Sequence, residues 1–200
     1  RLMEIIVITS PDAVPGEAGV ISELLDSGAV NRVHLRRPCA SAQEMGKLIE
    51  AVPQRLYGKL SVHSHFDLAI RYGLGGIHLN SHYSEIPAGF SGLISRSCHS
   101  LADIENAMQE DYVFLSPVFD SISKPGYVSK FSNTSLYIAN RFYYGKIVAL
   151  GGITPEKLLP LQDIGFAGAA MLGCVWSAFL SGHINSFISN LICIRRQLNI

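Results

Sequence analysis

Two glycine turns late in the chain have residue types and a spacing that suit phosphate binding. The apolar run Lys146–Leu150 stops at Gly151 and Gly152, and the run Gly168–Leu172 stops at Gly173. Glycine lets the backbone approach an anion closely, and a helix that starts at such a turn adds a favourable dipole. In a parallel β/α barrel the last two strands commonly end in this way. We therefore predict that one phosphate binds to the backbone at Gly151, Gly152, Leu172 and Gly173.

Histidines gather at the ends of other apolar runs. Six of the seven stand there, namely His34, His63, His65, His78, His82 and His99. Residues two apart on a strand share a face, so His34 is expected beside Arg36, and His63 beside His65. With Arg36, these side chains would form a polar, cationic mouth for an anionic ligand, with imidazoles able to move protons near neutral pH. The alternative is that some are buried histidines bonded to backbone.

The same histidines raise the question of a metal. Imidazole is a normal zinc ligand, but no ligand spacing stands out beyond His63-Ser64-His65. Magnesium prefers carboxylates and other oxygen ligands, in which the strand ends are poor. The sequence therefore assigns no residue as a metal ligand, and whether a metal binds stays open.

A long loop and a polar strand end add further candidates. Ser116–Gly126 is long for a strand-to-helix connection and carries an isolated Lys124. Loops of this length often act as lids, and a lysine there could close over a phosphate, although a solvated lysine is the alternative. The segment Ser95–His99 would add the Arg96 guanidinium and the Ser97 hydroxyl to the same mouth.

Short apolar runs alternate with segments of helical period along the whole chain. The predicted strands are Glu4–Thr9, Arg32–Arg36, Leu60–His63, Gly76–Leu79, Leu93–Ser97, Tyr112–Leu115, Lys146–Leu150 and Gly168–Leu172. The predicted helices are Gly16–Gly28, Ser41–Arg55, Phe66–Tyr72, Leu101–Gln109, Asn133–Arg141 and Ile184–Leu198, with Ser81–Gly92 too rich in glycine and proline to form one. Apolar strands alternating with helices imply a parallel sheet buried on both faces. We predict one α/β domain over residues 1–200, a compact (β/α)8 TIM barrel, with an open flavodoxin-like sheet as the alternative.

Composition excludes several classes of partner. The chain is 48% hydrophobic, and its sixteen basic and sixteen acidic residues balance. That balance provides no basic stripe for nucleic acid and no polybasic patch for a membrane. The sequence shows no secretory leader and no apolar run of the ~20 residues that span a bilayer. The scattered cysteines, without a zinc-type spacing, suit reduced thiols in a soluble cytoplasmic protein.

Taken in order, these motifs resemble one known family. They are His34-Leu-Arg36, Val62-His-Ser-His-Phe-Asp-Leu-Ala69, Gly75-Gly-Ile-His-Leu79, Arg96-Ser-Cys-His-Ser100, Asp111-Tyr-Val-Phe-Leu-Ser-Pro-Val-Phe119 and Ala149-Leu-Gly-Gly-Ile153. The series resembles the thiamine phosphate synthase superfamily, which includes the thiazole tautomerases, from about residue 4 to residue 180. The resemblance implies a (β/α)8 barrel and a role in thiamine biosynthesis. A synthase joins an aminopyrimidine pyrophosphate to thiazole phosphate and uses Mg²⁺, whereas a tautomerase isomerises a thiazole carboxylate phosphate without a metal.

The resemblance also assigns roles to residues. The family's thiazole-phosphate cup falls on the glycine turns described above. Arg36 matches the arginine that contacts the pyrimidine pyrophosphate, and Lys124 matches the loop lysine of the synthases. Pro117 stands where the tautomerases have their catalytic histidine, so the loop is closer to that of a synthase.

The metal and pyrophosphate site departs from the synthase pattern. His63-Ser64 replaces an Asn-Asp pair, Tyr83 aligns with a magnesium aspartate, and Pro38 replaces a lysine. Losing both carboxylates should weaken the binding of magnesium pyrophosphate. Asp67 is kept, but at a helix start it suits a capping or dipole role.

Three functions therefore stay open. The first is a thiamine phosphate synthase with a divergent pyrophosphate site, using Mg²⁺ although its usual ligands are not evident. The second is a metal-independent, tautomerase-like isomerase, and the third is a non-catalytic binder of thiazole or thiamine phosphate. The expected partners are phosphorylated thiazole and pyrimidine substrates, and a homo-oligomer is also allowed. The candidate catalytic residues are Arg36, Lys124, His63 and His99, and the candidate pocket residues are His34, Ser64, His78, Ser97 and Ser116.

Overall fold

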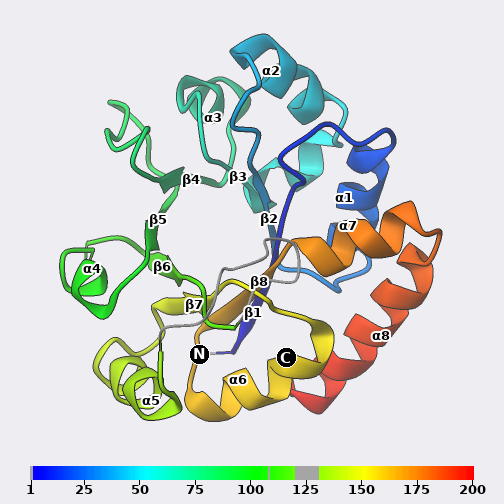
Figure 1. The fold of residues 1–200 in the computed structure, drawn as a ribbon. Helices are drawn as coiled ribbons and strands as arrows, with labels where there is room; N and C mark the ends of the chain where they lie inside the picture. The colour runs from blue at the N-terminus through cyan, green and yellow to red at the C-terminus, as the bar shows by residue number, and fades with distance from the viewer. Residues whose placement is uncertain (1, 108, 120–130) are drawn as a thin grey trace.

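Eight parallel strands close into one barrel. The structure is a computed structural model that describes residues 2–107, 109–119 and 131–200. The strands are β1 (Glu4–Ile8), β2 (Arg32–Leu35), β3 (Leu60–Val62), β4 (Gly76–Leu79), β5 (Leu93–Cys98), β6 (Tyr112–Leu115), β7 (Ile147–Ala149) and β8 (Gly168–Met171). They pair in sequence order, and β1 also pairs with β8, with Ile6 opposite Ala170 (Figure 1). The closing pair excludes the open sheet and confirms the predicted (β/α)8 barrel.

The strands are apolar because both of their faces are buried. On β1, Ile5 and Val7 belong to the large core between strands and helices, whereas Ile6 and Ile8 belong to a smaller cluster inside the barrel. Phe114 of β6 is a large member of that inner cluster. This alternation is the period-two pattern of a strand, applied to a sheet covered on both sides.

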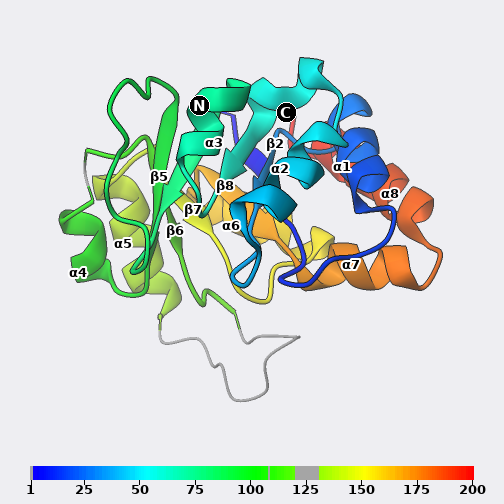
Figure 2. The same cartoon turned by 90° about the horizontal axis from the view of Figure 1, so that it is seen from above.

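Helices surround the strands, as Figures 1 and 2 show from two directions. They are α1 (Glu17–Asp26), α2 (Ala42–Glu50), α3 (Asp67–Tyr72), α4 (Leu101–Glu105), α5 (Asn133–Phe142), α6 (Leu158–Ile164), α7 (Gly173–Leu180) and α8 (Ile184–Gln197). Capping boxes fix the starts of α2, at Ser41, and α4, at Ser100. No helix follows β4, as predicted, and α4 ends four residues before its predicted limit. Within the described ranges, no helix combines the length and apolarity needed to cross a membrane.

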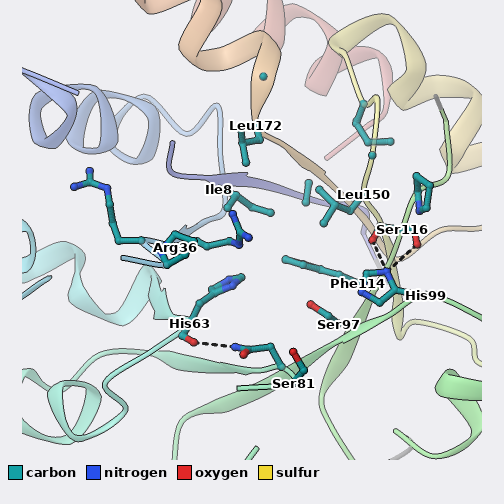
Figure 3. A pocket seen from close by; sticks show the side chains of 18 of the residues that line it. Ile8, Arg36, His63, Ser81, Ser97, His99, Phe114, Ser116, Leu150 and Leu172 are labelled. Atoms are coloured by element: carbon teal, nitrogen blue, oxygen red, sulfur yellow. Dashed lines mark hydrogen bonds between the residues drawn. The ribbon is translucent and has the colours of Figure 1, made fainter. Parts of the chain in front are cut away.

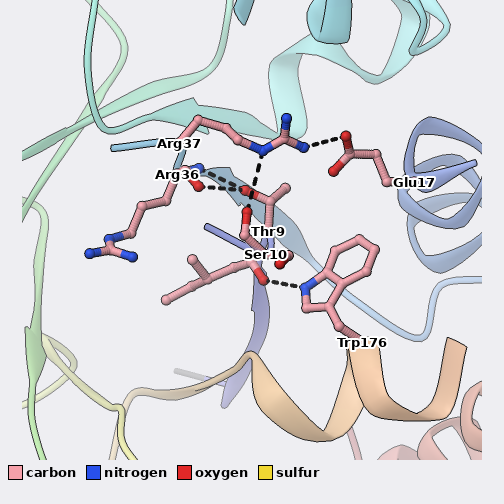
Figure 4. Close-up of polar contacts among 7 residues, drawn as sticks. Thr9, Ser10, Glu17, Arg36, Arg37 and Trp176 are labelled. Carbon is pink, nitrogen blue, oxygen red and sulfur yellow. Dashed lines mark hydrogen bonds and ion pairs between the residues drawn. The ribbon is translucent and has the colours of Figure 1, made fainter. Parts of the chain in front are cut away.

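A buried ion pair ties the end of β2 to the start of α1. The Arg37 guanidinium donates to the Glu17 carboxylate and, at 3.3 Å, to the Ser10 carbonyl (Figure 4). The two side chains are only 10% and 9% exposed, and Oε2 of Glu17 has no hydrogen-bond partner among the described residues. Removing one partner of such a pair leaves the other charge buried and uncompensated.

Replacing Arg37 with alanine is therefore expected to lower the free energy of unfolding by about 3 kcal/mol. Urea denaturation would measure the change. Arg55→Ala is the matched control, because Arg55 pairs with Asp26 at the surface, where the side chains are 60% and 44% exposed. Arg55→Ala should lower the free energy of unfolding by less than about 1 kcal/mol. Equal losses for the two variants would contradict a special role for the buried pair.

Candidate functional site

One cavity of about 820 Å³ opens at the carboxyl ends of the strands. Its walls come from the segments that follow β2 to β8, and its floor includes Ile8 and Phe114 from inside the barrel (Figure 3). The volume lies within the range of small-molecule sites, and active sites of this fold occur at this end. The predicted site residues that line it are Arg36, His63, Ser64, Ser97, His99, Ser116, Gly151, Gly152, Leu172 and Gly173.

Two of the predicted residues that the structure describes are not in the wall. His34 and His78 are fully buried and lie beneath the cavity, so the prediction that they line the substrate pocket is corrected. His34 precedes Arg36 by two residues, which places it about 6.6 Å deeper along the strand direction. Lys124 falls outside the described residues.

The glycine turns form a concave surface of backbone amides. Gly151 and Gly152 adopt φ angles of 95° and 60°, a region that disfavours side chains. A Cβ on Gly151 would stand 2.7 Å from Cα of Pro117, so only glycine fits there. The amides of Gly152 and Gly173 have no acceptor within the described part of the chain. Free N–H groups beside the start of α7 are suited to an anion.

Two contacts hold these turns in place. The Lys157 ammonium donates to the Gly152 carbonyl and also lies 4.4 Å from the centroid of the Phe119 ring. On α7, the Trp176 indole donates to the Ile8 carbonyl at 2.8 Å (Figure 4). The second contact fixes α7, and with it Gly173, against the end of β1.

Arg36 supplies positive charge to a different side of the cavity. Its backbone N–H donates to the Thr9 hydroxyl at 2.8 Å, which holds the residue after β2. Its guanidinium has neither an ion-pair partner nor a hydrogen-bond acceptor in the described ranges, and it extends away from Arg37 (Figure 4). Arg96, expected to add a second charge, instead pairs with Glu110 at 2.5 Å and does not line the cavity.

A hydrogen-bonded chain of aromatic side chains lies under the cavity floor. Nδ1 of His34 is 2.8 Å from Nε2 of His63, and Nε2 of His34 is 2.7 Å from the Tyr112 hydroxyl. The His63 and His78 rings stack with centroids 4.1 Å apart. His78 contacts the hydroxyls of Ser95 and Ser97, each at 2.8 Å. Only His63 in this group of histidines also lines the cavity.

Burial favours the neutral form of these three histidines, which argues against the expectation that they make the mouth cationic. Burial lowers the pKa values of His34 and His63 well below 6.5, and nearby positive groups add to the effect. For His78, burial and the neighbouring arginines lower the pKa to about 3. Within this buried group, therefore, no imidazolium is expected to add to the positive charge that Arg36 brings to the cavity.

Of the other histidines predicted at strand ends, His65 lies in a loop, whereas His99 lies in the wall of the cavity. His65 does not share a face with His63, because β3 ends at Val62 and His65 adopts a φ of 52°. Its Nε2 contacts the Ala40 carbonyl at 2.9 Å, away from the cavity. His99 does line the cavity, with its Nδ1 3.2 Å from the Ser116 carbonyl oxygen.

Sequence reasoning missed two residues that organise this region. The Asn80 amide, just after β4, donates to the His63 carbonyl at 2.8 Å and so fixes the loop that carries His63. The Tyr112 hydroxyl closes the histidine chain. An amide side chain directly after a strand was a usable signal for Asn80. The tyrosine contact joins positions 78 residues apart and had no local signal.

The side chains available as ligands do not suit zinc or magnesium, the two metals considered from the sequence. Nitrogens of His34, His63 and His78 lie within 4.8 Å of one another, but both ring nitrogens of His34 and of His78 are already hydrogen-bonded to other side chains. Among the described residues of the wall there is no carboxylate. Mg²⁺ prefers oxygen ligands and is usually held by at least one carboxylate, so these residues do not fit it.

The fold and the site together define a (β/α)8 barrel of the kind found in enzymes, with a small-molecule cavity at the carboxyl ends of its strands. A family model described as thiamine monophosphate synthase matches residues 5–175. The chain belongs to the thiamine monophosphate synthase family, which places it among the transferases of thiamine biosynthesis.

Individual relatives agree with this assignment. A thiamine phosphate pyrophosphorylase from Bacteroides thetaiotaomicron is 30% identical, with a TM-score of 0.85 over 97% of this chain and 98% of that one. A thiamine-phosphate synthase from Chlorobium luteolum is 29% identical over 182 residues, which are 86% of this chain and 84% of the relative. A thiamine phosphate pyrophosphorylase from Pyrococcus furiosus shares the fold, at 20% identity and a TM-score of 0.79.

Proposed function

We propose that this chain is a thiamine phosphate synthase with an altered pyrophosphate site. One observation carries the proposal, namely that a single cavity holds two separate places for an anion. The glycine turns after β7 and β8 offer backbone amides, whereas Arg36 after β2 offers a free guanidinium. Ile8 of β1 lies in the floor between them. Two anionic substrates are what a synthase must hold at once.

Each place would do a different part of the reaction. The glycine turns would bind the phosphate of the thiazole and fix the position of its ring. Arg36, with Lys124 from the loop, would stabilise the negative charge that grows on pyrophosphate as its bond to the pyrimidine breaks. Because the described wall lacks carboxylates, we assign no step to a protein-bound Mg²⁺.

One observation favours a second candidate, the thiazole isomerase. The cavity presents His63 and His99 without any carboxylate in its described wall, and imidazoles can carry the proton transfers of an isomerisation. The departure at Pro117 weighs against it, because the proline occupies the position that the tautomerase resemblance assigns to the catalytic histidine.

Product analysis separates these functions. The protein is incubated with aminopyrimidine pyrophosphate and thiazole phosphate, with Mg²⁺ and with a chelator in its place, and separately with the thiazole carboxylate tautomer. We expect thiamine phosphate and pyrophosphate in equal amounts from the first mixture. Isomerisation alone, lost on His63→Ala or His99→Ala, would establish the second candidate. Binding of thiazole phosphate without either reaction would leave a non-catalytic binder.

A further inference from the structure

One buried hydroxyl holds the main chain of Arg36 on both sides. Oγ1 of Thr9 accepts the Arg36 N–H at 2.8 Å and donates to the Arg36 carbonyl at 3.2 Å (Figure 4). A hydroxyl has one proton to donate and lone pairs that accept, so a single atom can make both bonds. Thr9 is fully buried and is not among the residues that line the cavity. It can therefore affect a bound ligand only through the residues that it holds.

These two bonds begin where the pairing of β1 with β2 stops. The last paired residues are Ile8 and His34, and the Thr9 N–H still donates to the His34 carbonyl at 2.9 Å. In a continued parallel ladder, the Thr9 carbonyl would accept the N–H of Arg36. The Thr9 hydroxyl accepts that N–H instead. The side chain thus ends the ladder and still gives the Arg36 N–H a partner.

The two bonds restrict both backbone angles of Arg36. The N–H belongs to the peptide unit before Arg36 and the carbonyl to the unit after it, so rotation about φ or ψ breaks one of the bonds. The direction of the Cα–Cβ bond is fixed as a result. Because the side chain is long, a turn of about 10° at that bond would move a guanidinium about 6 Å away by about 1 Å. A displacement of that size can cost about 100-fold in rate.

Thr9 is itself held by contacts to both of its neighbours in the chain. The Ile8 carbonyl accepts from the Trp176 indole at 2.8 Å, and the Ser10 carbonyl accepts from Arg37 at 3.3 Å (Figure 4). The Arg36 guanidinium lines the cavity but has no such contact with any described residue (Figure 3). Its position therefore depends on the main chain from which it extends.

We propose that Thr9 is a positioning residue, which holds Arg36 so that its guanidinium meets the pyrophosphate of the pyrimidine substrate. Thr9 supplies neither charge nor a proton to the reaction, but it fixes the residue that supplies the charge. The identity of the anion rests on the proposed synthase function. The clamp, meaning the two bonds between Oγ1 of Thr9 and the main chain of Arg36, rests on the structure alone and can be tested without a ligand.

Hydrogen exchange of the Arg36 amide tests the clamp. In the unmodified protein this amide should exchange at least about 100-fold more slowly than in an unstructured chain. Thr9→Val replaces the hydroxyl with a methyl group in a side chain of the same shape, so the Arg36 amide should exchange at least about tenfold faster. Thr9→Ser keeps the hydroxyl and should stay within about threefold. Ser22→Ala, which removes a hydroxyl bonded to the Ala18 carbonyl on α1, should change nothing at Arg36.

Two results would overturn the clamp. One is an Arg36 amide that exchanges as fast as in an unstructured chain in the unmodified protein, a measurement that decides the matter even if Thr9→Val does not fold. The other is a folded Thr9→Val protein in which the Arg36 amide speeds up no more than the amides of β6, since that would be a general loss of stability.

Isothermal titration calorimetry with inorganic pyrophosphate tests the positioning role. Thr9→Val should weaken pyrophosphate binding about tenfold, whereas Thr9→Ser should stay within about threefold of the unmodified protein. When Arg36 is already glutamine, adding Thr9→Val should change the affinity less than about twofold, because the residue that Thr9 holds no longer carries a charge. Thiazole phosphate, which we assign to the glycine turns, should bind to all these variants within about twofold of its unmodified affinity.

Three results would overturn the positioning role. They are a tenfold loss that persists when Arg36 is glutamine, an equal loss for thiazole phosphate, and a Thr9→Ser protein that binds pyrophosphate as weakly as Thr9→Val does. Failure of the unmodified protein to bind pyrophosphate would contradict the anion site of the proposed function, and with it the role of Thr9 toward that anion. The exchange result for the clamp would stand in that case, so the two failures can be told apart.

Discussion

Replacing Gly152 with valine is expected to weaken the binding of thiazole phosphate about 1,000-fold while the barrel stays folded. Gly152 has a φ of 60°, which a β-branched residue adopts only with strain, so the turn must change shape. Its amide would then no longer point at the phosphate, and the new side chain would crowd the anion. Losing about two hydrogen bonds to a charged group, each worth ~1.5–3 kcal/mol, corresponds to this change in affinity. Isothermal titration calorimetry would measure it.

Gly28→Val is the matched control for backbone strain. Gly28 has a φ of 73° and open space where a Cβ would stand, and it follows the end of α1 without lining the cavity. It should destabilise the protein to a similar degree, by circular dichroism on heating, and leave the affinity for thiazole phosphate unchanged. A folded Gly152→Val protein that still binds thiazole phosphate normally would remove the glycine turns from the site.

Most of the fold could be predicted because a parallel barrel imposes a simple pattern. A strand covered on both faces is mainly apolar, and it is generally followed by a helix that returns the chain to the other end of the barrel, although a loop does this after β4. The strand starting at Gly76 and the one starting at Tyr112 were predicted with both limits correct. Helix lengths were harder, since capping at Ser100 sets where α4 begins, while its end depends on tertiary packing.

The sequence predicted which strand ends form the site. It did not predict how deep inside the barrel each side chain lies. Period two predicts which face of a strand a residue occupies, as in the prediction that His34 shares a face with Arg36. It does not tell which layer of the barrel the residue reaches. His34 therefore looked like a ligand-binding group, and only the closed barrel shows that it lies a layer below, bonded to Tyr112.

The charges of the cavity could not be read from residue types either. Arg37 and Arg96 are as basic as Arg36, but each meets a carboxylate brought in by the fold, at Glu17 and Glu110. Those partners stand 20 and 14 residues away in the chain, and no local pattern links them. Only the tertiary structure shows that Arg36 is the arginine left available to an anion.

That availability makes Arg36 the residue with the largest expected effect on turnover. Arg36→Gln keeps a polar side chain of similar length and removes the charge, so we expect kcat/KM for aminopyrimidine pyrophosphate to fall about 1,000-fold. The fall should be large because the described wall offers no carboxylate to recruit a metal in its place. Steady-state kinetics with saturating thiazole phosphate would measure it.

The same variant distinguishes the two anion-binding places from each other. Because the glycine turns do not involve Arg36, its affinity for thiazole phosphate should stay within about twofold of the unmodified value. Arg71→Gln, on the exposed surface of α3, removes the same charge away from the cavity and should leave both quantities unchanged. If Arg36→Gln weakened the binding of both ligands equally, the cavity would hold a single anion site and the synthase proposal would fail. If only the binding of the pyrimidine compound is weakened, the cavity must have two sites, one for each substrate, as the joining reaction demands.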